Sequence, residues 1–258
     1  MKYSTLQGRE RVAETLSHLP LRPASKEWRG SASKARRREQ SSLRLEKKLW
    51  GKGYKYVACL DEAGRGPLAG PVVAAAVLIK NSKSQILNSE FRNLKLKDSK
   101  NLSRRQREKF YRIIIKNKNI EWGIGIVSER VIDKINIKNA AELAMVKAIK
   151  KLKIKPDFLI IDGNHVKNLK LKSYSLKLMV KADEKVFSCA AASILAKVAR
   201  DRIMERYHKK YPCYGLNKHK GYPTKLHLRM LNKYGPCGIH RKSFGPVRTC
   251  KTKRLVVI

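Results

Sequence analysis

YVACLDEAGRGPLAGPVVAAAVLI, residues 56–79, places an apolar run on each side of an acidic, glycine-rich turn. The first run ends in Asp61 and Glu62, and neighbouring strand residues point to opposite faces of a sheet. The two carboxylates can therefore share one site only where the strand ends and the chain turns. Gly64, Gly66 and Gly70 permit such a turn and let backbone N–H groups approach a ligand closely. The pattern indicates either an active site or an ordinary acidic hairpin loop.

The same arrangement recurs twice further along the chain. Residues 158–162, FLIID, form a short apolar run that ends in Asp162. Residues 178–183, LMVKAD, end in Asp183 and precede a helical stretch rich in small residues. Taken singly, Asp162 is an ordinary turn residue and Asp183 an ordinary N-cap of a helix that begins near Glu184. Taken together, they predict three strands that each deliver a carboxylate at the C-terminal end.

Carboxylates gathered in this way predict a metal site. Ligands bind at the C-terminal ends of the strands in open sheets that have helical crossovers. Like charges that converge repel one another, so such a cluster requires a compensating cation. Oxygen ligands without a supporting His or Cys suit Mg2+ or Mn2+ rather than zinc.

Five motifs, in order along the chain, resemble those of bacterial ribonuclease HII. They are DEAGRGPLAGPV at 61–72, IDGN at 161–164, KAD at 181–183 running into AAASILAKV at 190–198, HKGYPT at 219–224, and SFGPV at 243–247. The resemblance implies an α/β fold of the RNase H-like kind, a mixed sheet flanked by helices. The sister family ribonuclease HIII resembles the chain less well, because it usually has glutamate where Asp183 stands and a different residue where Arg65 stands.

The resemblance also implies an activity and a set of catalytic residues. Ribonuclease HII is an endonuclease that cuts the RNA strand of RNA–DNA hybrids, and single ribonucleotides embedded in duplex DNA, by two-metal hydrolysis. The cut falls 5′ to the ribonucleotide at the RNA–DNA junction and leaves a 3′-hydroxyl and a 5′-phosphate. The catalytic and metal-binding residues that the resemblance implies, with Mn2+ or Mg2+ as cofactor, are Asp61, Glu62, Asp162 and Asp183.

Substrate-binding residues follow from the resemblance in the same way. It implies that the backbone of Gly64, Arg65 and Gly66 contacts the 2′-hydroxyl, the group that distinguishes RNA from DNA at one position. It also implies that Tyr222, within HKGYPT, packs on the deoxyribose that follows the ribonucleotide. The expected partners are RNA–DNA hybrids and duplex DNA that contains ribonucleotides.

The composition independently predicts a polyanionic partner. The 258 residues include 60 Lys and Arg against 20 Asp and Glu, a formal net charge of +40. Nucleic acid or an anionic membrane surface fits such a charge. No run approaches the roughly 18 apolar residues of a membrane span, and the N-terminus lacks an apolar signal core. We therefore expect a cytoplasmic monomer without a membrane partner.

The cysteines and histidines predict neither a disulfide framework nor a zinc site. Five cysteines are an odd number without a C-x-x-C motif, which favours reduced thiols. Cys213, His219, Cys237 and His240 form a group near the C-terminus, but their spacings match no zinc finger or ribbon. We expect these side chains to be solvated or to face nucleic acid.

The chain divides into three predicted parts. Residues 1–53 form a flexible basic N-terminal arm with a short helix around residues 43–49. Residues 54–206 form the RNase H-like catalytic domain. Residues 207–258 form a C-terminal helical basic extension that binds substrate, because Lys and Arg are interleaved there with tyrosines.

Local patterns predict several elements of the central part. SRRQ at 103–106 matches a capping box and predicts the start of a helix. Residues 120–127 alternate enough to predict a further strand. Residues 140–148 predict a helix that leads to Pro156. Strands followed by alternating strands and helices indicate a mixed α/β sheet.

Two other hypotheses are compatible with parts of this pattern. A noncatalytic basic protein that binds structured RNA would account for the charge, with the carboxylates as turn and capping residues. A ribonuclease H that needs a run of ribonucleotides would account for the carboxylates, but not for the Gly-Arg-Gly and Tyr222 motifs. The recurrence of strand-terminal carboxylates favours an enzyme over a binding protein.

Overall fold

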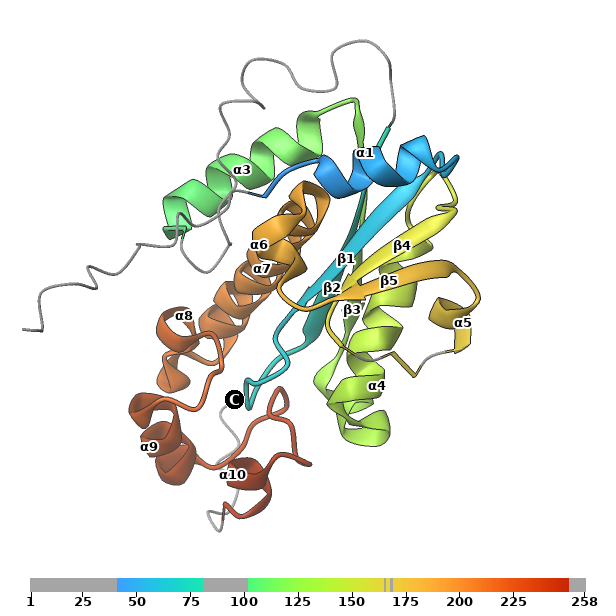
Figure 1. Ribbon diagram of the computed structural model, residues 1–258. Coiled ribbons are helices and arrows are strands. Elements are labelled where there is room, and N and C mark those ends of the chain that lie inside the picture. Colours follow the sequence, from blue (N-terminus) through green and yellow to red (C-terminus); the bar gives the residue numbers. More distant parts are fainter. Residues whose placement is uncertain (1–40, 81–101, 165, 168, 251–258) are drawn as a thin grey trace, which may run out of the picture. The chain divides into compact units, whose positions relative to one another are not determined.

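A five-stranded sheet runs through the computed structural model, which describes residues 41–80, 102–164, 166–167 and 169–250 (Figure 1). Its strands are β1 (Val57–Ala63), β2 (Val72–Ile79), β3 (Ile120–Val127), β4 (Phe158–Asp162) and β5 (Ser175–Met179), and their order is β3-β2-β1-β4-β5. β1, β2 and β3 are antiparallel neighbours, whereas β4 is parallel to β1 and β5 is parallel to β4. The predicted mixed sheet is confirmed.

Helices cover both faces of this sheet. α4 (Glu129–Ile149) packs against β2 and β3 on one face, and α7 (Phe187–Lys210) packs against β1 and β2 on the other (Figure 1). The other helices are α1 (Arg44–Gly51), α3 (Arg104–Lys116), α5 (Leu169–Lys172), α6 (Ala182–Lys185), α8 (Leu216–His219), α9 (Lys225–Tyr234), α10 (Gly245–Arg248) and the 3-10 helix η2 (Pro212–Tyr214). None of these described helices is long and apolar enough to cross a membrane.

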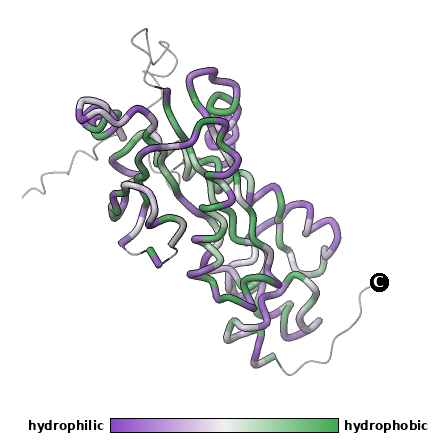
Figure 2. The backbone as a smooth tube through the Cα atoms, turned by 90° about the vertical axis from the view of Figure 1, so that its right-hand side faces the viewer, coloured by the Kyte–Doolittle hydropathy of each residue, from purple (hydrophilic) through white to green (hydrophobic). Residues whose placement is uncertain are grey.

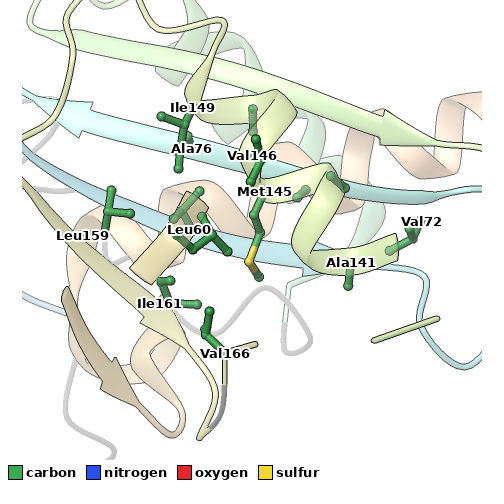
Figure 3. Close-up of a cluster of buried hydrophobic side chains, with 14 of the residues drawn as sticks. Leu60, Val72, Ala76, Ala141, Met145, Val146, Ile149, Leu159, Ile161 and Val166 are labelled. Atoms are coloured by element: carbon green, nitrogen blue, oxygen red, sulfur yellow. The ribbon is translucent and has the colours of Figure 1, made fainter. Parts of the chain in front are cut away.

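The sequence of β2 explains why the sheet is covered twice. All eight residues of β2 are buried, and successive residues point to opposite faces. Ala74, Ala76 and Leu78 join the core beneath α4, while Ala75, Val77 and Ile79 join the core beneath α7. Figure 3 shows the α4 side, where Met145 and Ile149 lie against Leu60 and Ala76. In Figure 2 the hydrophobic stretches of the tube run through the interior and the hydrophilic ones mark the outer turns.

Several local predictions are confirmed. Ser103 caps α3, because its hydroxyl accepts a hydrogen bond from the backbone N–H of Gln106 (3.2 Å) and its own N–H donates to the Gln106 side chain (2.8 Å). The strand predicted at residues 120–127 is β3. The helix predicted at residues 140–148 is the second half of α4, which begins earlier and is kinked at Asn136, where φ is 63°.

The segment before β1 and the segment after α7 also contain the predicted helices. The short helix before the first strand is α1, whose Leu49 packs with Val57 of β1. Glu46 of α1 accepts hydrogen bonds from the backbone and hydroxyl of Ser188 at 3.1 and 2.6 Å. After α7 the described chain consists of the short helices η2 to α10. Residues 1–40 of the predicted N-terminal arm and residues 251–258 of the predicted extension lie outside the described residues.

Candidate active site

Asp61 and Asp162 lie at the same edge of the sheet. They follow Leu60 of β1 and Ile161 of β4, which are partners in the parallel register of these two strands. Two backbone groups orient the carboxylates. The N–H of Glu62 donates to Oδ1 of Asp61 at 2.7 Å, and the N–H of Ala182 donates to Oδ1 of Asp162 at 3.2 Å. The structure therefore brings these two predicted residues together.

Asp183 reaches this edge from a helix and not from a strand end. β5 ends at Met179, and Lys181 adopts the left-handed conformation with φ 58°. That conformation breaks the strand and starts α6 at Ala182, so the strand predicted through residues 178–183 is wrong. The alternative that Asp183 is an N-cap is wrong as well, because the N-cap is Lys181 and Asp183 lies inside α6. Its side chain is nonetheless buried beside the two strand carboxylates.

Three carboxylates form a potential metal-binding group. One oxygen from each of Asp61, Asp162 and Asp183 lies within 4.8 Å of the other two. Within the described residues, this is the only group of three or more His, Cys, Asp or Glu side chains so placed. The group of Cys213, His219, Cys237 and His240 weighed from the sequence does not meet that geometry in the described part of the chain. The expectation that these side chains are solvated or face nucleic acid is wrong for His219 and His240, which are buried.

Glu62 stands apart from the three aspartates. β1 continues to Ala63, so Glu62 is still within the strand and points to the opposite side from Asp61. Its side chain is only 10% exposed and pairs with Nη1 of Arg65 at 3.1 Å, while the Arg65 side chain is 54% exposed. The structure thus assembles three of the four predicted carboxylates and places the fourth next to them.

Burial and mutual repulsion dominate the electrostatics of this site. Burial raises the pKa of Asp61 well above its ordinary value, and the charges of Glu62, Asp162 and Asp183 raise it further, against a hydrogen bond from Ser193 of α7. Burial also raises the pKa of Glu62, although Arg65 opposes that shift. Asp61 and Glu62 therefore resist ionisation, chiefly because they are buried and also because acidic neighbours repel them, and a cation would stabilise their charged forms.

The glycine-rich loop after β1 is held by a buried arginine that the sequence analysis missed. Arg241 is fully buried, and its guanidinium donates to three main-chain carbonyls of this loop. The distances are 2.6 Å to Gly64, 3.0 Å to Arg65 and 2.9 Å to Gly70. Burial lowers the pKa of Arg241 to about 9, with the nearby charge of Arg200 acting in the same direction. In the sequence, Arg241 looks like any phosphate-binding arginine of the basic C-terminal region.

A second buried arginine, Arg200 of α7, holds the other half of the loop. It donates to the carbonyls of Ala69 (3.2 Å), Pro71 (3.0 Å) and Lys220 (3.1 Å). Gly64 is required beside it, because φ there is +97° and an added Cβ would overlap with the Arg200 side chain. The spacing of Arg200 from the acidic motifs in the sequence contains no signal that would have revealed its hydrogen bonds to the loop.

Tyr222 lies next to the same loop. Tyr222 is 42% exposed, and a Cβ built on Gly66 would lie 3.7 Å from its Cε1 atom. The guanidinium of Arg200 lies 5.9 Å from the centre of the ring. The predicted substrate-binding residues are therefore neighbours in space although about 156 positions separate them in sequence.

Comparison with known proteins agrees with this geometry. The family model described as ribonuclease HII matches residues 58–247. The chain belongs to the ribonuclease HII family. It is 46% identical over 206 residues to the ribonuclease HII of Caldicellulosiruptor bescii, covering 80% of this chain and 94% of that protein. It is 49% identical over 199 residues to the ribonuclease HII of Caldanaerobacter subterraneus subsp. tengcongensis, covering 77% of this chain and 78% of that protein.

Solved structures show the same fold. The ribonuclease H2 of Pyrococcus horikoshii OT3 superimposes with a TM-score of 0.62 at 30% identity, covering 75% of this chain and 95% of that one. The ribonuclease HII of Archaeoglobus fulgidus, solved as a complex with PCNA, gives 0.59 at 27% identity over 77% and 98%. The chain is accordingly an endoribonuclease of the type 2 ribonuclease H class that acts on RNA–DNA hybrids. The hypothesis of a noncatalytic basic RNA-binding protein is set aside.

Proposed function

We propose that this ribonuclease HII family member also cuts at single ribonucleotides embedded in duplex DNA. The cut falls 5′ to the ribonucleotide at the RNA–DNA junction and leaves a 3′-hydroxyl and a 5′-phosphate. The observation that carries the proposal is the group of Asp61, Asp162 and Asp183, because it lies beside a loop and a tyrosine that suit recognition of one sugar.

The three aspartates fit a divalent metal, and Glu62 supplies the fourth carboxylate. All donors are carboxylate oxygens, the ligand type that Mg2+ and Mn2+ prefer, and no His or Cys takes part. Asp61, Glu62, Asp162 and Asp183 would hold a pair of such ions, which would supply activation of the attacking water and stabilisation of the leaving 3′ oxygen. The chain itself orients the acids, through the backbone N–H groups of Glu62 and Ala182 and through the hydrogen bond from Ser193.

In the proposed enzyme, the glycine loop (residues 64–70) recognises the ribonucleotide. In a trans peptide the C=O and N–H of one unit point in opposite directions. The carbonyls of Gly64 and Arg65 point at Arg241, so the N–H groups of Arg65 and Gly66 point away from that buried guanidinium. We assign these N–H groups, with the backbone of Gly64, to the 2′-hydroxyl, and the ring of Tyr222 to the neighbouring deoxyribose.

The basic parts of the chain complete the proposed enzyme. Residues 1–53 and 207–258 flank the catalytic domain of residues 54–206 and neutralise phosphates of the duplex. Each phosphate contact makes binding salt-dependent without contributing to the choice of the cleavage site. We propose that the enzyme acts as a cytoplasmic monomer on ribonucleotide-containing duplexes.

The decisive experiment offers the protein a DNA duplex with one ribonucleotide. Incubation with Mg2+, with Mn2+ and with EDTA, followed by mapping of both product ends, is expected to show metal-dependent cleavage 5′ to the ribonucleotide only. An all-DNA duplex and the Asp162→Asn variant serve as controls. Cleavage of continuous RNA–DNA hybrids without any cleavage of this duplex would support instead a ribonuclease H that needs a run of ribonucleotides.

A further inference from the structure

Three buried histidines lie directly behind Tyr222. His227 and His240 are essentially inaccessible to solvent, and His219 is 9% exposed. The rings of His219 and His227 are stacked with centroids 4.5 Å apart, and the ring of His240 follows at 5.3 Å from that of His227. Neither the acidic site nor the glycine loop contains any of them, so the proposed chemistry leaves them without a role.

Their hydrogen bonds determine one set of tautomers. The backbone N–H of Cys237 donates to Nδ1 of His240 at 3.0 Å, so the proton of a neutral His240 is on Nε2. That Nε2 lies 3.1 Å from Nε2 of His227, which must then accept and carry its own proton on Nδ1. Nδ1 of His227 lies 3.0 Å from the carbonyl oxygen of Tyr222 and donates to it. The result is one directed chain from Cys237 to Tyr222.

His219 holds the same turn from a second side. Its Nδ1 accepts a hydrogen bond from the N–H of Gly221 at 3.2 Å, and its Nε2 donates to the carbonyl of Tyr214 at 2.8 Å. Gly221 has φ +86°, and a Cβ there would lie 2.6 Å from the carbonyl oxygen of Ala69. The backbone of residues 219–222 is therefore fixed by imidazoles on one side and by the glycine loop on the other.

The hydrogen bond between His227 and His240 links the two backbone segments that bind the glycine loop. Leu68 donates its N–H to the carbonyl of Gly221, and Gly70 donates its N–H to the carbonyl of Ile239, both at 2.8 Å. The segments that contain Gly221 and Ile239 are joined behind the loop by the hydrogen bond between His227 and His240. A change in that bond therefore reaches both backbone segments that grip the loop.

We propose that His227 and His240, as neutral imidazoles, position Tyr222 against Gly66 and thereby set the selectivity for a single ribonucleotide. They are positioning residues, because His227 bonds the backbone carbonyl of Tyr222 and His240 acts on Tyr222 only through His227. The inference rests on the proposed function of Tyr222 as a substrate-binding residue. Protonation of Nε2 of His227 would place its N–H against the N–H of His240 Nε2, and the hydrogen bond between the two imidazoles would be lost. Burial opposes that protonation, since it lowers the pKa of His227 to about 4 and that of His240 to about 3.

Amide substitutions separate the two nitrogens of each ring. His227→Asn keeps an amide near the Nδ1 position, so it can still donate to Tyr222, whereas His227→Gln keeps only the end that faces His240. The readout is the ratio of kcat/KM on a duplex with one ribonucleotide to kcat/KM on a continuous RNA–DNA hybrid. We expect His227→Gln to lower this ratio roughly 3- to 10-fold, the effect of one hydrogen bond. His227→Asn keeps the bond to Tyr222 but loses the bond to His240, so it should lower the ratio less, about 2- to 3-fold.

A second pair of variants and a matched control protect the test against misfolding. His240→Gln keeps a donor near Nε2 and should retain the ratio, whereas His240→Asn should lower it about as much as His227→Asn, because both variants lose the same hydrogen bond. His208→Gln is the control, because Nδ1 of His208 has no hydrogen-bond partner among the described residues and the ring is not in the chain. Thermal unfolding monitored by circular dichroism establishes that each variant is folded at the assay temperature. An equal loss of activity on both substrates would make the histidines simple packing residues and overturn the inference.

A double-mutant cycle with Tyr222→Ala distinguishes the inference from the function on which it rests. If His227 acts through Tyr222, the double variant should show the same ratio as Tyr222→Ala alone. An unchanged ratio in Tyr222→Ala would overturn the proposed function of Tyr222. A lowered ratio in Tyr222→Ala, together with an unchanged ratio in His227→Gln or with additive effects, would overturn the role of the histidines only.

Discussion

Acidification should destabilise the fold through His227 and His240. Both imidazoles are buried in the neutral form, and burial depresses the pKa of His227 to about 4 and that of His240 to about 3. In the unfolded chain the same groups titrate near 6.5. As the pH falls below 6.5, the unfolded state binds protons at these imidazoles and the folded state does not. The free energy of unfolding therefore falls. The loss is confined to the window between about pH 6.5 and pH 3 to 4.

The size of the effect follows from the width of that window. A shift of one pKa unit corresponds to about 1.4 kcal/mol, so each histidine costs about 2 kcal/mol at pH 5 relative to neutral pH. The pair costs about 4 kcal/mol, a large fraction of the usual stability of about 5–15 kcal/mol. Asp61 and Glu62 act in the opposite direction, because their raised pKa values let the folded state take up protons and gain stability on acidification.

The measurement is the free energy of unfolding in urea at pH 7.5 and pH 5, with EDTA present. Wild type is compared with the double variant His227→Asn/His240→Gln. This variant has no imidazole at positions 227 and 240 but keeps the carboxyl groups of Asp61 and Glu62. We expect the loss between the two pH values to be about 4 kcal/mol smaller in the variant. The same loss in both proteins would show that these imidazoles are not neutral in the fold, and the tautomer argument would fail with it.

Three further predictions concern the site itself. Asp162→Asn should abolish cleavage in Mg2+ and leave duplex affinity within a few-fold, measured by single turnover and filter binding; near wild-type turnover would contradict the metal assignment. Gly64→Ala should lower the free energy of unfolding by at least about 1–2 kcal/mol, because a side chain at that positive φ is strained and overlaps Arg200, and it should weaken junction cleavage; an unchanged urea midpoint would refute this. Deleting residues 1–40 should reduce the salt slope of binding without moving the cleavage position, and an unchanged slope would remove the arm from the interface.

Local patterns predicted the part of the site that depends on neighbouring residues. The apolar runs that end in Asp61 and Asp162 became β1 and β4, since a short buried run bounded by glycine has few alternatives to a strand. The capping box at Ser103 also depends only on residues within one helical turn. In each case the residues that determine the element are close together in sequence, so a local pattern is enough to predict it.

The rest of the site depends on long-range contacts that a local pattern does not contain. Asp183 was placed correctly next to the other aspartates but on the wrong element, because a left-handed Lys181 has no sequence signal comparable to glycine. Arg200 and Arg241 were missed because a buried arginine bonded to carbonyls and an exposed arginine awaiting phosphate look alike in a chain of net charge +40. His219 and His240 were weighed as metal ligands and His227 was not considered, because the hydrogen bonds among these histidines join residues that are distant in sequence.

The glycine loop separates two regions of buried charge, and this arrangement explains how one short segment serves both chemistry and recognition. The acids lie before the loop at the sheet edge, and the guanidiniums of Arg200 and Arg241 lie beneath it. Glu62 and Arg65 form an ion pair at the start of the loop, in which Glu62 is largely buried and Arg65 is more than half exposed. In the proposed enzyme, the Glu62 carboxylate would exchange Arg65 for a metal ion and leave Arg65 free to contact the duplex, while the buried guanidiniums keep the loop backbone in place.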